Sequence, residues 1–210
     1  MNDNSIMTGE TEWPLFIMAH GAGAGSDSDF MQQMAGLLAE RKIATLRFDF
    51  PYMQRIKTEG KRRPPDKVPA LIEDYCSRIE QVGRACVIGG KSMGGRVASL
   101  IAANAPAQVK GCACLGYPFH PAGKPDKLRT DHLMTISTPL LIVQGTRDAL
   151  GNKEEVAGYN LPENIQWLWL AEGDHDLKPR KASGFTHSQH LQSAADAIAE
   201  FVRCCLRSEV

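Results

Sequence analysis

Short apolar runs alternate along the chain with stretches in which apolar residues recur every three or four positions. A short apolar run between turn residues is typical of a buried strand, and a spacing of three to four is typical of a helix packed on one face. The pattern therefore predicts strands that alternate with helices, a mostly parallel α/β sheet with helices on both faces. The apolar runs that predict strands are 13–19, 43–48, 85–89, 110–116, 139–144 and 165–170.

The same pattern predicts the helices and the loops between them. The predicted helices cover 26–41, 66–82, 95–103, 153–159 and 188–206, with a short one near 128–135. Residues 49–65 and 117–127 contain proline, glycine and charged residues, so they are predicted to be loops. We expect residues 1–12 to form a loose tail and residues 13–210 to form a single domain.

A G-x-S-x-G pattern, Gly90 to Gly94, lies between a predicted strand and a predicted helix. This arrangement is typical of a nucleophile elbow, where a serine sits on a tight turn with its hydroxyl above the edge of the sheet. The helix that follows directs its first N–H groups and its dipole toward the serine, which favours a developing oxyanion. Ser92 is therefore the candidate nucleophile.

Gly90-Lys91-Ser92 also resembles the end of a phosphate-binding P-loop. That motif requires a further glycine five positions before the glycine of the Gly-Lys-Ser triplet. Position 85 is alanine, so the pattern does not fit a P-loop.

Three further segments directly follow predicted strands. They are a glycine loop, defined as residues 20–25, and the segments that contain Asp148 and His175. In a parallel sheet the carboxyl ends of the strands share one edge, where ligands bind. A serine, an acid and a histidine in that chain order match the order of α/β-hydrolases.

The chain resembles the α/β-hydrolase superfamily over nearly its whole length. It looks most like the small, lidless, dienelactone-hydrolase-like group, whose members open with a loop of the HGAGAGSDS type. That resemblance implies a three-layer fold without a cap domain. Because no room is expected before Trp13 for the extra antiparallel strands of larger members, we expect six strands in the order 2-1-3-4-5-6. The matching segments are His-Gly-Ala-Gly-Ala-Gly-Ser-Asp-Ser at 20–28, Gly-Gly-Lys-Ser-Met-Gly-Gly at 89–95, Gly-Thr-Arg-Asp at 145–148 and Gly-Asp-His-Asp at 173–176.

The chemistry of such a site assigns a role to each residue. Ser92 is the expected nucleophile, His175 the base that takes its proton, and Asp148 the group that fixes the imidazole tautomer. The backbone N–H groups of Met93 and Ala22 are the expected oxyanion hole. The predicted function is hydrolysis of an ester, thioester or similar bond in a small soluble acyl compound, without a metal or another cofactor. The alternative is a non-catalytic scaffold of the same fold that binds a partner or a small ligand.

Several polar residues near these segments have more than one interpretation. We expect His20 to support the glycine loop. His187 and His190 are expected to be exposed or capping residues near the start of the last helix, and each is an alternative base. Lys91 is interpreted as an exposed lysine rather than a group that attracts an anionic substrate.

Composition limits the possible partners. Lys plus Arg and Asp plus Glu number 24 each, so the formal net charge is zero and nothing indicates a nucleic-acid partner. The first residues lack the basic start and apolar run of a signal peptide, and no apolar run is long enough to span a membrane. Six cysteines in such a chain are typical of a reduced cytosolic protein, so a cytoplasmic location is expected.

Overall fold

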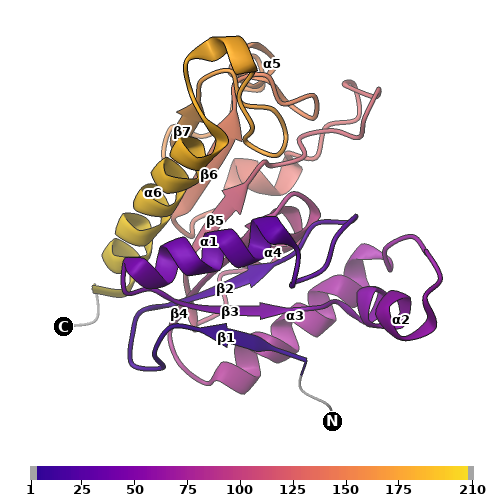
Figure 1. Cartoon of the computed structure of the whole chain (residues 1–210), viewed down its shortest axis with the longest axis vertical. Coiled ribbons are helices and arrows are strands. Elements are labelled where there is room, and N and C mark those ends of the chain that lie inside the picture. Colours follow the sequence, from indigo (N-terminus) through magenta and orange to yellow (C-terminus); the bar gives the residue numbers. More distant parts are fainter. Residues whose placement is uncertain (1–3, 208–210) are drawn as a thin grey trace.

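A seven-stranded sheet runs through the molecule with the strand order β1-β3-β2-β4-β5-β6-β7 (Figure 1). The structure is a computed structural model and describes residues 4–207. All neighbouring strands are parallel except β1, which pairs antiparallel with β3. The strands are β1 Ile6–Thr8, β2 Leu15–Ala19, β3 Ala44–Phe48, β4 Cys86–Lys91, β5 Val109–Leu115, β6 Leu140–Gly145 and β7 Gln166–Leu170.

Helices cover both faces of the sheet, because each parallel crossover returns the chain over one face. Helices α1 and α6 pack on one face, in front of the sheet in Figure 1, and α3 and α4 pack on the other. Each face encloses its own apolar cluster, so strands β2 to β6 are buried on both sides. The helices are α1 Asp29–Glu40, α2 Pro51–Glu59, α3 Val68–Val82, α4 Met93–Ala102, α5 Lys153–Ala157 and α6 His187–Arg207, with 3₁₀ turns at Asp131–Thr135 and Lys181–Ser183.

The prediction of six strands was wrong by one edge strand. Strand β1 lies within the segment expected to be a tail, and its residues Ile6 to Thr8 pair with β3. It has only three residues, and Ile6 and Met7 are exposed, so no buried apolar run marks it in the sequence. The six predicted strands follow one another across the sheet in the expected order, with β1 added outside β3.

The segment 49–65 was also predicted incorrectly, because helix α2 occupies much of it. Proline at the first helical position is compatible with a helix start, and Gly60 ends the helix in a left-handed conformation at φ 68°. Phe50, Tyr52 and Met53 are buried in the core. The start of α2 therefore belongs to the apolar cluster on one face of the sheet.

Candidate active site

Ser92 joins strand β4 to helix α4 in a strained backbone conformation. Its φ of 51° and ψ of −115° are rare for a residue with a side chain. A Cβ atom at Gly90 would lie 2.3 Å from the carbonyl oxygen of Ala19, and one at Gly94 would lie 2.4 Å from the same atom. These two glycines let the end of β2 lie directly against the turn, and this contact fixes the position of Ser92.

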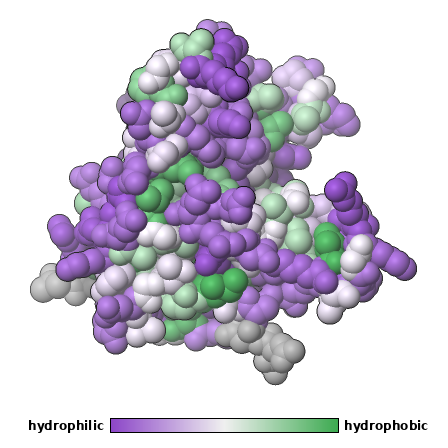
Figure 2. All heavy atoms as spheres, viewed as in Figure 1, coloured by the Kyte–Doolittle hydropathy of each residue, from purple (hydrophilic) through white to green (hydrophobic). Residues whose placement is uncertain are grey.

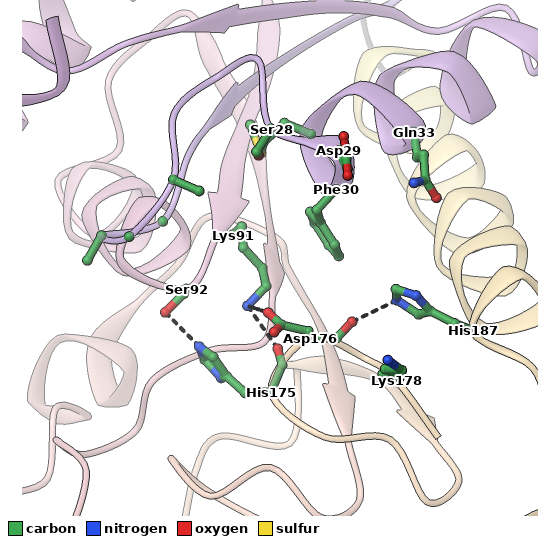
Figure 3. Close-up of a pocket in the computed structure, with 15 residues that line it drawn as sticks. Ser28, Asp29, Phe30, Gln33, Lys91, Ser92, His175, Asp176, Lys178 and His187 are labelled. Atoms are coloured by element: carbon green, nitrogen blue, oxygen red, sulfur yellow. Dashed lines mark hydrogen bonds and ion pairs between the residues drawn. The ribbon is translucent and has the colours of Figure 1, made fainter. Parts of the chain in front are cut away.

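The structure brings together the three residues that the sequence placed on separate loops. Figure 3 shows two of them, Ser92 and His175, joined by a dashed line. The Ser92 Oγ lies 2.8 Å from Nε2 of His175, and the Nδ1 of His175 lies 2.8 Å from Oδ2 of Asp148. With an unprotonated Nε2, the serine hydroxyl donates to the imidazole and the imidazole N–H donates to the carboxylate. Asp148 is fully buried and the His175 side chain is 27% exposed.

The carboxylate of Asp148 receives further hydrogen bonds that hold it in place. Gln144 donates from Nε2 to its Oδ2 over 2.9 Å, and the backbone N–H of Leu150 donates to its Oδ1 over 2.8 Å. Gln144 is buried and accepts a hydrogen bond from the N–H of Tyr117. Gln144 had no predicted role, although a polar residue near the end of an otherwise apolar buried strand was a usable signal.

His175 lies in the histidine loop, defined as residues 173–179, which follows β7. The carboxylate of Asp174 accepts hydrogen bonds from the N–H groups of Asp176 and Lys178, each over 2.9 Å, and so stabilises the turn. A bridge between Gly173 and Pro179 joins the two ends of the loop. The loop therefore has a defined local shape.

Lys91 is buried, which contradicts the expectation of an exposed lysine. It is 7% exposed, and its Nζ donates to the carbonyl oxygen of His175 over 2.8 Å and lies 3.1 Å from Oδ1 of Asp176. Burial lowers the pKa of the Lys91 ammonium, and Asp176 partly opposes this effect. Burial raises the pKa of the Asp176 carboxyl, but Lys91 outweighs it, so the net shift is downward. Lys91 is thus a link between the elbow and the histidine loop.

His20 supports the glycine loop, as the sequence predicted. Its Nδ1 donates to the carbonyl oxygen of Gly21 over 2.7 Å, and its Nε2 accepts from the N–H of Phe50 over 3.1 Å. One nitrogen donates and the other accepts, so the ring is neutral, and burial lowers its pKa accordingly. The hydroxyl of Tyr52 lies 3.2 Å and 3.1 Å from the carbonyl oxygens of Gly21 and Ala22.

The two alternative histidines have other partners. His187 lines the cleft and donates from Nε2 to the carbonyl oxygen of Asp176 over 3.0 Å. His190 is buried, contrary to expectation, and donates from Nδ1 to the carbonyl oxygen of Leu177 over 2.8 Å. Both histidines therefore hold the histidine loop against helix α6.

Ser92 and Ala22 both line a cleft of about 830 Å³. The glycine loop, the start of α1, the elbow, the histidine loop and His187 form its walls. Met93, whose N–H is the other predicted oxyanion donor, directly follows Ser92 as the first residue of α4. The lining residues are Gly21, Ala22, Gly23, Ala24, Ser28, Asp29, Phe30, Met31, Gln33, Lys91, Ser92, His175, Asp176, Lys178 and His187.

Neither a metal site nor a membrane-spanning helix is present in the described part of the chain. Within residues 4–207, no group of three or more His, Cys, Asp or Glu side chains is arranged to hold a metal ion. None of the helices in that range combines the length and apolar character needed to cross a membrane.

A family model described as an alpha/beta hydrolase domain matches residues 12–203. The chain belongs to the alpha/beta hydrolase family. Solved structures of other hydrolases of this fold are similar to it at low sequence identity. Est1E from Butyrivibrio proteoclasticus is 16% identical with a TM-score of 0.72, over 97% of this chain and 94% of that one. The monoacylglycerol lipase of Paleococcus ferrophilus is 15% identical with a TM-score of 0.71, over 98% and 100%.

A dienelactone hydrolase from Anabaena variabilis is 20% identical to this alpha/beta hydrolase, with a TM-score of 0.66 over 93% of this chain and 88% of that one. At these identities the likeness demonstrates a shared fold. The predicted superfamily is confirmed by the family match, and a hydrolytic activity is consistent with the membership. The bond cleaved has to be argued from the site itself.

Proposed function

We propose that this protein is a serine hydrolase that cleaves ester or thioester bonds in small soluble acyl compounds. One observation carries the proposal: Ser92, on a strained turn at the start of a helix, is hydrogen-bonded to His175, which is hydrogen-bonded to the buried Asp148. Strain of this kind is maintained by surrounding structure and is concentrated at functional sites. The nucleophile, base and orienting acid of acyl transfer require this arrangement.

In the proposed reaction, the Ser92 Oγ attacks the acyl carbon as its proton passes to Nε2 of His175. Asp148 stabilises the imidazolium that forms, and the backbone N–H groups of Met93 and Ala22 bind the oxyanion of the tetrahedral intermediate. His175 then donates the proton to the leaving group, and a water molecule activated by the same imidazole releases the acyl group. Each oxyanion donor contributes about 3 kcal/mol to stabilisation of the transition state.

The open surroundings of the cleft favour a small substrate and a place in the lidless, dienelactone-hydrolase-like group. Between β5 and β6 the described chain holds a loop and one 3₁₀ turn at Asp131–Thr135, too little for a cap. Hydrophilic residues predominate on the face shown in Figure 2, and hydrophobic ones occur there in small groups. Because long acyl chains need a large apolar surface to bury, hydrolysis of p-nitrophenyl esters should fall as the acyl chain lengthens beyond a few carbons.

Labelling with a fluorophosphonate, followed by mass-spectrometric mapping, tests the proposal. Wild-type protein should be labelled at Ser92, and Ser92→Ala should abolish labelling. Ser28→Ala is the matched control, because Ser28 lines the same cleft but belongs to the start of α1. Labelling at another serine, or none in folded protein, would overturn the proposal in favour of a non-catalytic scaffold.

A further inference from the structure

Lys91 is a charged side chain buried at the centre of the site, and the steps proposed above do not use it. It occupies the position between Gly90 and Ser92, and it is only 7% exposed. Burying an ammonium group costs free energy unless charged or polar partners compensate it. The identity of its partners therefore indicates why a lysine occupies this position.

Both polar partners of Lys91 belong to the histidine loop. The Nζ donates to the backbone carbonyl of His175 over 2.8 Å and lies 3.1 Å from the Asp176 carboxylate. The same ammonium lies 5.6 Å from the centre of the Phe30 ring, within the range of a cation–π interaction. Figure 3 shows the Lys91 side chain extending from the elbow to these two loop residues.

These contacts attach the elbow to His175 at two points. Ser92 is hydrogen-bonded to the imidazole of His175, and its neighbour Lys91 is hydrogen-bonded to the backbone of the same residue. Without Lys91, side chains would hold the backbone here from the α6 side, where His187 and His190 bind the carbonyls that follow His175. With the carbonyl also held, the distance between the Ser92 Oγ and the imidazole is fixed by two neighbouring residues of one rigid turn.

We infer that Lys91 is a positioning residue, which holds His175 within reach of Ser92 by binding the backbone of the histidine loop and pairing with Asp176. The catalytic consequence rests on the proposed function, whereas the attachment itself does not. A competing role, recognition of an anionic substrate, fits the exposed Lys178 better, because the ammonium of Lys91 already has a carbonyl and a carboxylate as partners.

The attachment can be tested without turnover, because it acts on the backbone of the histidine loop. Local opening of a loop exposes its amides to exchange with solvent. Lys91→Met removes the donor to the carbonyl of His175, so the amides of residues 173–179 should exchange about tenfold faster than in the wild type. Lys91→Arg keeps the charge and a donor, so it should restore part of the protection.

Hydrogen exchange followed by mass spectrometry measures this protection. Lys124→Met is the control, because Lys124 is an exposed lysine outside the cleft. A general loss of stability would speed exchange throughout the sheet, whereas loss of the attachment should speed it in the histidine loop. Unchanged exchange of this loop in Lys91→Met would overturn the inference.

The rate of fluorophosphonate labelling at pH 7 tests the catalytic consequence. Lys91→Met should slow labelling of Ser92 by about tenfold or more, because small displacements of a reacting group cost that much. Lys91→Arg, which keeps the charge and a donor, should recover a large part of the rate, and Lys124→Met, which changes an exposed lysine outside the cleft, should keep all of it. If Lys91→Met labels at the wild-type rate, the inference fails. If wild-type Ser92 is not labelled, the proposed function fails, and hydrogen exchange of the histidine loop still decides the attachment.

Folding of the Lys91 variants is checked by thermal unfolding. Should Lys91→Met not fold, Asp176→Asn still decides the question, because the Asp176 side chain is 71% exposed and the buried Lys91 ammonium keeps the carbonyl of His175 as a partner. In that variant the amides of the histidine loop should exchange faster than in the wild type. Unchanged exchange would contradict the inference.

Discussion

The elbow and the histidine loop meet at the same site, but they are held in different ways. At the elbow, Gly90 and Gly94 lie against the carbonyl of Ala19, so close backbone contacts determine the turn. The histidine loop is held mainly by polar contacts from distant parts of the chain, among them Asp148 and Lys91. A segment shaped by backbone contacts tolerates few changes of residue size, whereas one held by hydrogen bonds depends on the charge and donor pattern of its partners.

The largest effect is expected from removing the charge that orients the histidine. Asp148→Asn keeps the size of the side chain but replaces a carboxylate oxygen with an N–H₂ group facing Gln144 and His175, which both donate. The imidazole tautomer would then be wrong for accepting a proton from Ser92. Fluorophosphonate labelling should slow by about 10⁴-fold. Thermal unfolding is the control for the fold, and a labelling rate within tenfold of wild type would contradict the proposed role of Asp148.

A larger residue in place of an elbow glycine should instead lower the stability of the folded protein. A Cβ at position 94 would lie 2.4 Å from the backbone oxygen of Ala19, which cannot move without displacing β2. Gly94→Ala should therefore lower the free energy of unfolding by about 3 kcal/mol or more. Gly36→Ala in α1 is the control, because a Cβ there meets nothing within 4 Å. Urea unfolding of both variants measures the difference, and equal stabilities would show that the elbow is not shaped by this contact.

The Tyr75 side chain binds the backbone just before the elbow, so its hydroxyl is a polar contact in a region otherwise shaped by close backbone packing. Its buried hydroxyl accepts from the N–H of Gly89 over 3.0 Å and lies 2.6 Å from the carbonyl oxygen of Ile17. Tyr75→Phe leaves those backbone groups without this partner and should cost about 1–3 kcal/mol of stability. The half-buried Tyr159, changed to phenylalanine, is the comparison variant, and a smaller loss for Tyr75→Phe than for Tyr159→Phe would contradict this account.

The smallest effect concerns His132, whose Nε2 lies 2.8 Å from the Oγ of Ser99 on the elbow helix α4. Burial lowers its pKa from 6.5 to about 4, and Arg96 adds to this effect. As the pH falls, the imidazole is therefore protonated in the unfolded chain before it is protonated in the folded protein. The stability that neutral His132 contributes is complete above pH 6.5 and is lost as the pH falls toward 4. In that range the unfolding constant should rise by up to about tenfold per pH unit.

His132→Gln removes this contribution, so its stability should fall less steeply between pH 6.5 and 4 than that of the wild type. The buried His20 also has a lowered pKa, but it is present in both proteins and cancels in the difference. Urea unfolding at several pH values measures both slopes. Identical slopes would mean that His132 is as readily protonated in the folded protein as in the unfolded chain.

The sequence alone predicted what local patterns determine. The apolar runs identified the parallel strands, and the glycines around Ser92 identified the elbow, since both follow from residues close together in the chain. Strand β1 was not predicted, because Ile6 and Met7 are exposed and do not form the apolar run of a buried strand. The roles of Gln144 and Lys91 were not predicted, because they depend on groups that only the folded sheet brings near them.

The distance along the chain between the elbow and the histidine has a consequence for how the protein is made. Ser92 and His175 lie 83 positions apart, and the lysine attachment spans 84. During synthesis the elbow leaves the ribosome long before β7 and the loop that follows it, and contacts over such separations form late. Under the proposed mechanism, Ser92 lacks a base until then and remains an ordinary alcohol. An incomplete chain would therefore carry no activated nucleophile, and reactivity would begin only when the final strand has joined the sheet.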